Sequence, residues 1–316
     1  MKTRIFFASD VHSSEVCYLK FLNSGKFYKS DVIMLCGDLT GKAIVPIVKQ
    51  NDGKYTADFL DQKKVLSSPE ERLSLEKVIR NSGYYFYYTT PEELNELKAD
   101  PGKLDVLFSK LMCDAVERWI GIAEQRLKGS NIKCIISPGN DDRYEIDTIL
   151  RKSDLIINPE EKVILLDEKH EMITVGSANP TPFHCPRDLP EEELERRIEN
   201  MVSSVKDLKN CVFNTHVPPY NTQLDTAPIL DENLKVVAKG GQIQYGPAGS
   251  TAVRKAIETH QPILGLHGHI HESRAAQKIG RTLCINPGSE YQQGILRGAL
   301  IDLKDEKIEQ HYLTSG

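Results

Sequence analysis

Short apolar runs recur along the chain, and a polar cluster follows each of them. These runs are rich in Val, Ile, Leu and Phe: RIFFAS (4–9), VIMLC (32–36), KCIIS (133–137), NCVFN (210–214) and PILGL (262–266). Runs of this length and composition are typical of strands that are buried on both faces of a sheet. The pattern therefore predicts buried strands with polar side chains at their ends.

Amphipathic stretches separate several of these runs and predict helices at 15–22, 144–151, 191–208 and 250–259. Strands that alternate with helices favour a layered α/β fold. In such folds ligands bind in the crevice at the carboxyl ends of the strands, which is where the polar clusters begin. Near the C-terminus, alternating patterns at 281–286, 297–303 and 307–313 predict further strands that complete a sheet.

Residues 43–130 interrupt the alternation. Turn residues at 51–53 predict a hairpin, and the sequence from 69 to 128 is predicted to be helical. A stretch of this length is too long for a plain connection, so we expect a helical insertion or cap within a single domain of residues 1–316. Its aromatic block YYFYY (84–88) is expected to pack the cap. Alternatively, this aromatic block stacks against a substrate or forms the contact of a homo-oligomer.

Composition narrows the class of protein. The chain has 316 residues, 40% hydrophobic and 27% charged, as in soluble globular proteins. A net charge of −5 gives no broad basic surface, so nucleic acid is not the expected partner. The seven cysteines form no CxxC pair, which fits a reducing compartment. No segment approaches the ~20 apolar residues of a membrane helix, and the apolar run at the N-terminus is too short for a signal peptide. We therefore expect a cytoplasmic protein without a membrane partner.

Side chains that can bind a metal lie at five of the predicted strand ends. They are Asp10 and His12 in DVH, Asp38 in GDLTG, Asn140 in GNDD, His216 in THVPP, and His269 and His271 in GHIH. One such cluster alone usually marks a turn or a helix cap. Together they predict a site for divalent transition metals, because alternate residues of an extended chain point to the same side. A structural zinc site would call for cysteines, and none of these motifs contains one.

The ordered set DxH, GDxxG, GN(H)D, H and GHxH resembles that of the calcineurin-like metallophosphoesterases, and NPGSE (286–290) resembles a segment of that family too. The motifs span residues 10–271 and leave the insertion outside the resemblance. The resemblance implies a four-layer αββα sandwich with two divalent metal ions at its edge. Mn²⁺, Fe²⁺, Zn²⁺, Ni²⁺ and Co²⁺ all suit His, Asp and Asn ligands, and Mn²⁺ or iron is favoured.

By this resemblance one metal would bind Asp10, His12, Asp38 and His271, and the other would bind Asp38, Asn140, His216 and His269. Asp38 would bridge the two ions. The implied reaction is hydrolysis of a small phosphodiester or phosphomonoester by a hydroxide that bridges the metals. The alternative is a metal-binding interaction scaffold of the same fold that has lost catalysis.

The sequence departs from the family at position 141, where the family often has a histidine proposed to protonate the leaving group. An exposed aspartate such as Asp141 is an anion at pH 7 and cannot donate a proton. Three explanations are open: Asp141 is held protonated, the leaving group needs little help, or His184 in the Pro-rich loop NPTPFHCPRD supplies the proton. The second is favoured, which points to diesters or activated phosphates. Asp142 is expected to fix the turn or orient a ligand.

Overall fold

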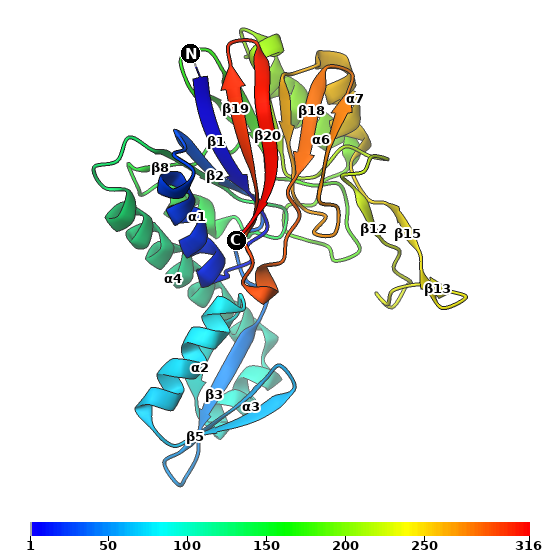
Figure 1. Ribbon diagram of the computed structural model, residues 1–316. Coiled ribbons are helices and arrows are strands. Elements are labelled where there is room, and N and C mark those ends of the chain that lie inside the picture. Colours follow the sequence, from blue (N-terminus) through cyan, green and yellow to red (C-terminus); the bar gives the residue numbers. More distant parts are fainter. Residues whose placement is uncertain (1) are drawn as a thin grey trace.

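The computed structural model describes residues 2–316 and contains two large sheets of six strands each (Figure 1). The first has the order β20-β19-β1-β2-β7-β8, with β1 (Lys2–Ala8), β2 (Val32–Cys36), β7 (Lys133–Ser137), β8 (Ile156–Ile157), β19 (Arg297–Lys304) and β20 (Lys307–Ser315). The second has the order β17-β18-β16-β11-β10-β9, with β9 (Val163–Leu165), β10 (Glu171–Val175), β11 (Val212–Thr215), β16 (Leu264–Leu266), β17 (Ala275–Ile279) and β18 (Thr282–Asn286). All five predicted apolar runs form strands in these sheets.

The two sheets pack against each other through one apolar cluster. Ile5 and Phe7 of β1 are fully buried in it together with Leu264 and Ile285 of the second sheet. Phe6, between them in sequence, belongs instead to a cluster on the outer face of the first sheet, because successive side chains of a strand point to opposite faces. The strands β1, β2 and β7 are parallel neighbours, and so are β10, β11, β16 and β18. Their carboxyl ends therefore lie at common edges.

Helices cover the outer faces of both sheets. On the first sheet lie α1 (Glu15–Phe27), α4 (Pro101–Leu127) and α5 (Glu145–Leu150), and on the second lie α6 (Glu191–Val202) and α7 (Thr251–His260) (Figure 1). The expected α/β class is confirmed. The helix predicted for 191–208 ends earlier, and a short 3-10 turn, η1 (Leu208–Asn210), follows it. Within residues 2–316, no helix is both long enough and apolar enough to cross a membrane.

Most of residues 43–130 forms a separate lobe below the two sheets in Figure 1. The lobe contains a four-stranded sheet in the order β5-β4-β3-β6. The hairpin predicted around 51–53 is confirmed, because the two strands that flank this turn pair antiparallel. The prediction of helix throughout 69–128 is wrong, because a strand at 85–89 lies within that range. The elements of the lobe are β3 (Ile44–Lys49), β4 (Tyr55–Phe59), β5 (Gln62–Leu66), α2 (Pro69–Asn81), β6 (Tyr85–Thr89) and α3 (Pro91–Ala99). The segment YFYYT of β6 is rich in aromatic residues and pairs in parallel with β3. Tyr85 is buried, which confirms a packing role for that residue.

Three helices of this region start in the same way, with a capping residue followed by proline. Ser68, Thr90 and Asp100 each accept a hydrogen bond from a backbone N–H of the first turn of α2, α3 and α4. Proline suits the first helical position because its φ is already helical and no N–H is lost. The last of these helices, α4, packs on the first large sheet through Met112 and Trp119. It therefore belongs with the main body and links the lobe to it.

A long arm of residues 226–248 projects from the second sheet (yellow in Figure 1). Two short antiparallel pairs build it: β12 (Thr226–Pro228) with β15 (Tyr245–Pro247), and β13 (Ala238–Lys239) with β14 (Gln242–Ile243). Nothing in the apolar pattern predicted this arm.

Candidate metal centre

The five polar motifs meet at one edge of the two sheets. They follow β1, β2 and β7 of the first sheet and β11 and β16 of the second, and the ligand candidates are Asp10, His12, Asp38, Asn140, His216, His269 and His271. Because these strands run parallel within each sheet, their carboxyl ends bring the side chains together. All but His269 and His271 are buried.

A first group consists of Asp10, His12 and His271, whose donor atoms all lie within 4.8 Å of one another. The Nε2 atoms of His12 and His271 are 3.2 Å apart, and the same atom of His271 is 3.5 Å from Asp10 Oδ1. Two imidazole nitrogens and a carboxylate oxygen that converge in this way form a site of the kind that transition metals occupy.

A second group consists of Asp38, His216 and His269, also with donor atoms within 4.8 Å. His269 Nδ1 is 2.9 Å from Asn140 Oδ1, which adds an amide oxygen to this group. Asp38 faces both groups, since its Oδ1 is 3.3 Å from His216 Nε2 and its Oδ2 is 3.6 Å from His12 Nε2. The two oxygens of this carboxylate are thus placed to bridge two ions.

The electrostatics of the centre suit a cation. Burial lowers the pKa of His12 to about 3 and that of His269 to about 4, so both rings are neutral and offer lone pairs. Burial also lowers the pKa of His216, but Asp38 and then Asp10 outweigh it and raise the value to about 9. The carboxylates that raise this pKa attract any cation. Within residues 2–316, neither buried ring nitrogen of His216 has a hydrogen-bond partner, which leaves one of them free to bind an ion.

The backbone of the centre is strained at its ligands. Asp10, His12, Asp38 and His269 have φ values of 54°, 39°, 44° and 67°, in the left-handed region that residues other than glycine seldom adopt. Such strain persists only where the surroundings enforce it, and it gathers at functional sites. Close packing adds to this: a Cβ at Gly139 would lie 2.2 Å from Asp38 Oδ1, so only glycine fits beside that carboxylate.

Asp142 ties together the turns that carry two of the candidate ligands. Its carboxylate accepts hydrogen bonds from the backbone N–H groups of Leu39 (2.9 Å), Thr40 (2.8 Å) and Gly139 (2.8 Å). These groups belong to the loops after β2 and β7, which hold Asp38 and Asn140. The placement agrees with the expectation that Asp142 fixes the turn.

Asp188, which sequence reasoning missed, orients the amide of Asn140. Asn140 Nδ2 donates to Asp188 Oδ1 at 2.8 Å, so the amide oxygen of Asn140 turns toward His269. The other oxygen of Asp188 accepts from the backbone N–H groups of Thr181 and Cys185, both at 3.0 Å. Asp188 thereby fixes a whole loop beside the centre. Its only sequence signal was its position as the last residue of the Pro-rich segment NPTPFHCPRD.

The NPGSE segment supports the centre from the opposite side. Ser289 Oγ donates to the carbonyl oxygen of Asp10 at 2.6 Å. Asn286 Nδ2 lies 3.1 Å from the carbonyl oxygen of Gly268 and 3.0 Å from that of Ile270, which are the residues on either side of His269. The segment thus fixes the backbone of two ligand motifs.

No protein-family model matches the chain. Over 152 residues, or 48% of its length, the chain is 36% identical to the uncharacterized protein MJ1162 of Methanocaldococcus jannaschii, and this match spans 61% of that protein. One solved crystal structure covers 100% of the chain and 99% of its own length with 16% identity and a TM-score of 0.60. The crystal structure of TT1561 of Thermus thermophilus covers the same shares with 15% identity and a TM-score of 0.55.

These likenesses concern the fold, and the two six-stranded sheets with five motifs at their shared edge agree with them. The chain shares its overall fold with these two structures. Within this fold, the seven predicted ligand positions come together as two adjoining groups.

Asp141, where the sequence departs from the motifs of the family that it resembles, forms an ion pair. Lys42 Nζ lies 3.0 Å from Asp141 Oδ2, and Cys185 Sγ lies 3.6 Å from Oδ1. The expectation of an exposed aspartate is wrong, because only 23% of this side chain is accessible. Burial and then Asp38 raise its pKa above the usual range, while Lys42 lowers it. Lys42 was also missed, although it directly follows the GDLTG motif.

His184 lies outside the centre. Its side chain is exposed, and its backbone N–H donates to the carbonyl oxygen of Thr181 at 3.2 Å. Its neighbours Phe183 and Cys185 line the pocket beside the metal ligands, whereas His184 is not among the described residues that do so. The structure therefore does not bring this candidate proton donor to the site.

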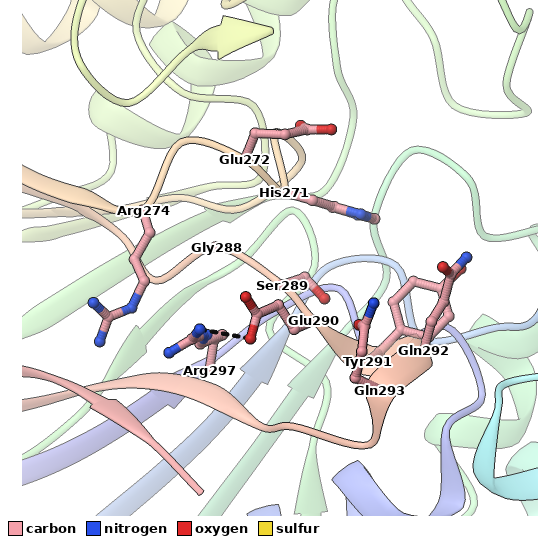
Figure 2. Close-up of a pocket in the computed structure, with 10 residues that line it drawn as sticks. All are labelled: His271, Glu272, Arg274, Gly288, Ser289, Glu290, Tyr291, Gln292, Gln293 and Arg297. Atoms are coloured by element: carbon pink, nitrogen blue, oxygen red, sulfur yellow. Dashed lines mark hydrogen bonds and ion pairs between the residues drawn. The ribbon is translucent and has the colours of Figure 1, made fainter. Parts of the chain in front are cut away.

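Two pockets adjoin His271. One, of about 450 Å³, has a polar lining that includes Arg274, Gln292 and the ion pair of Arg297 with Glu290, 2.5 Å apart (dashed in Figure 2). The other, of about 560 Å³, contains Asp38, Lys42, Asn140, Asp141, His269 and His271 at one end. A ligand held at the metal centre therefore has room on two sides, and the two sides differ in chemistry.

Proposed function

We propose that the protein is a dinuclear metal-dependent phosphoesterase that hydrolyses a small phosphodiester or phosphomonoester. The observation that carries this proposal is the position of Asp38, whose two oxygens face separate groups of histidine and carboxylate donors. Two metal ions about 3.5–4 Å apart are the arrangement that clamps a phosphoryl group in many phosphatases and nucleases.

One ion would be held by Asp10, His12, Asp38 and His271, and the other by Asp38, Asn140, His216 and His269. The donors are neutral imidazoles, carboxylates and one amide oxygen, which fit Mn²⁺ or iron and also Zn²⁺, Ni²⁺ or Co²⁺. When bound, two such ions supply positive charge for the phosphoryl oxygens and lower the pKa of water to near neutrality. The protein's own residues fix the geometry around them.

Lys42 supplies a further positive charge beside the phosphoryl position. Its ammonium group lines the same pocket as the ligands, and Asp141 holds it there at 3.0 Å. Asp141 in turn donates its backbone N–H to Asp38 Oδ1 at 3.0 Å. We infer that Lys42 donates a hydrogen bond to a phosphoryl oxygen and that Asp141 positions it. Because Asp141 is engaged in this ion pair, we assign no residue as proton donor to the leaving group. Substrates whose leaving group needs little protonation therefore remain favoured, namely diesters and activated phosphates.

Further expectations belong to the same proposal. Apolar clusters on both faces of each sheet support the four-layer αββα sandwich of the family. The lobe within residues 43–130 would act as a cap or as the contact of a homo-oligomer, and its exposed Val65 and Leu73 support such a contact. The net charge of −5 disfavours nucleic acid as substrate. A cytoplasmic location fits the seven free cysteines.

Removal of a ligand tests the proposal. We expect His216→Ala and Asp38→Ala to abolish metal-dependent hydrolysis of bis(p-nitrophenyl) phosphate, while His311→Ala, an exposed residue on an edge strand, serves as the control. Elemental analysis should find two metal ions per wild-type chain and fewer in the two ligand variants. Turnover that survives complete chelation of metal would refute the proposal. Two bound ions without hydrolysis of any phosphoester in a broad panel would favour the inactive scaffold.

A further inference from the structure

The larger pocket beside the metal centre has an apolar wall opposite the ligands. Three segments form this wall: the loop 179–185 after β10, the start of the arm at 227–236, and Ile270 between the two histidines of GHIH. Its volume of about 560 Å³ lies in the range of sites that bind small organic molecules. The pocket is continuous with the centre, because Asn140 and His269 line it as well.

The wall offers few hydrogen-bond donors and much apolar surface. Pro180, Pro182 and Pro228 line it and have no backbone N–H to donate. Phe183 projects into water with 62% of its surface accessible, although it is large and aromatic. Covering such a ring with an apolar group removes apolar surface from water and is therefore favourable.

The arm completes this wall as an ordered surface. Leu230 and Val236 line the pocket and face each other across an isolated bridge, and 48% of Val236 is exposed. Backbone hydrogen bonds hold the arm in place: Val237 N donates to Ile229 O at 2.8 Å, and Ile229 N donates to Gln244 O at 2.9 Å. The apolar side chains are therefore presented to the pocket by a hydrogen-bonded frame.

One carboxylate of the wall, that of Asp231, is already occupied. Its oxygen accepts backbone N–H bonds from Asn233 at 2.8 Å and from Lys235 at 2.9 Å within its own turn. This oxygen of Asp231 therefore stabilises the turn of the arm. On the other side of His271, the pocket of Figure 2 has the opposite character, with Arg274, Arg297 and Glu290 in its lining.

We propose that the pocket between loop 179–185 and the arm binds an apolar, ring-sized organic group that is joined through an ester oxygen to the phosphoryl group of the substrate. This inference rests on the proposed phosphoesterase function and names the class of substrate. The phosphoryl group lies at the metal centre near Lys42, and the apolar group covers Phe183, Leu230 and Val236. A polar group of comparable size would face the pocket of Figure 2 instead.

Phosphonates test the inference without turnover, because their carbon–phosphorus bond is not hydrolysed. Calorimetry compares phenylphosphonate and methylphosphonate on the full chain loaded with Mn²⁺. We expect phenylphosphonate to bind at least about tenfold more tightly. In Phe183→Ala and in Val236→Ser this preference should fall to about threefold or less. Phe27→Ala is the matched control, because Phe27 is an aromatic residue with 78% exposure at the end of α1, away from the pocket, and the preference should be unchanged.

The outcomes separate the inference from the function on which it rests. Equal affinities for the two phosphonates would overturn the inference and leave the phosphoesterase proposal standing. A phenyl preference that survives both pocket variants would overturn the placement of the group in this pocket. If neither compound binds and bis(p-nitrophenyl) phosphate is not hydrolysed, the proposed function falls and the inference falls with it.

Discussion

Lys42→Met is the substitution that most directly tests the proposed role of Lys42 beside Asp141. Position 141 is where the sequence departs from the motifs of the family that it resembles. The change removes the ammonium group that lies 3.0 Å from Asp141 and keeps a side chain of similar length. It leaves Asp141 beside the phosphoryl position without a cation, since no other lysine or arginine of residues 2–316 forms an ion pair with it. We therefore expect a lost attraction for an anionic substrate, together with a repulsion at any pH at which Asp141 is ionised.

The size of the effect follows from charge and exposure. Two unit charges about 4 Å apart interact by about 4 kcal/mol at an effective dielectric constant of about 20. The side chain of Lys42 is 55% exposed, so water and salt screen much of this, and about 1–2 kcal/mol is the realistic range. This corresponds to a loss in kcat/KM of roughly 5- to 30-fold. A phosphomonoester dianion should lose more than a diester monoanion.

The assay measures kcat/KM for p-nitrophenyl phosphate and for bis(p-nitrophenyl) phosphate, with the metal content of each variant determined in parallel. Lys42→Arg should retain most of the activity because the charge is kept. Lys54→Met is the matched control, since Lys54 is 51% exposed and pairs with Asp52 at 3.7 Å in the lobe. Asp141→Ala should change the rate by less than about a hundredfold, because Asp141 positions Lys42 and donates no proton.

The reasoning fails if Lys42→Met keeps the wild-type kcat/KM for both substrates at full metal content. It also fails if the diester and the monoester lose activity equally while Lys42→Arg gives no rescue, since charge would then not be the cause. A loss of more than about a thousandfold in Asp141→Ala would instead make Asp141 itself the proton donor.

Two further predictions concern stability. Arg187→Met should lower the free energy of unfolding, measured by urea denaturation, by about 3–5 kcal/mol. The reason is that buried Arg187 pairs with Asp147 at 2.8 Å and donates to the carbonyl oxygen of Asp142 at 2.7 Å. A loss below about 1 kcal/mol would contradict the buried pairing. Burial raises the pKa of Glu160 to about 8 from 4.5, so its contribution is fully present below pH 4.5 and is lost as the pH rises through 8. Glu160→Gln should therefore gain stability relative to wild type as the pH rises from 4.5 to 8, and a difference independent of pH would show that the carboxyl is not desolvated.

The sequence was sufficient for the central strands of the large sheets and for the convergence of the candidate metal ligands, and the reason is local. Each ligand motif stands directly after an apolar run, as Asp10 stands after β1 and His216 after β11. The carboxyl ends of parallel neighbours meet at one edge, so position in the chain already implied position in space. The residue types then indicated the chemistry, since His, Asp and Asn without Cys point to transition metals.

The lobe could not be derived in this way. Its sheet depends on the parallel pairing of β3 with β6. The strands β4 and β5 and the 13-residue helix α2 lie between these two strands in the sequence. Pro46 within β3 and the lysines of β5 argue against strands when each segment is read alone. Pairing across such a separation is decided by tertiary packing, which a local pattern does not contain.

The residues that we propose to decide specificity were missed for a related reason. Lys42 and Phe183 are exposed, and an exposed lysine or a single aromatic residue in a loop is ordinary in any sequence. Their meaning comes from what loops and the arm place next to them, namely Asp141 beside Lys42 and Val236 in the same pocket as Phe183. Buried strand ends fix the candidate metal donors, whereas exposed loops and the arm shape the pocket beside them. A homologue with the same five motifs and a different arm should therefore keep the metal centre and accept a different organic group.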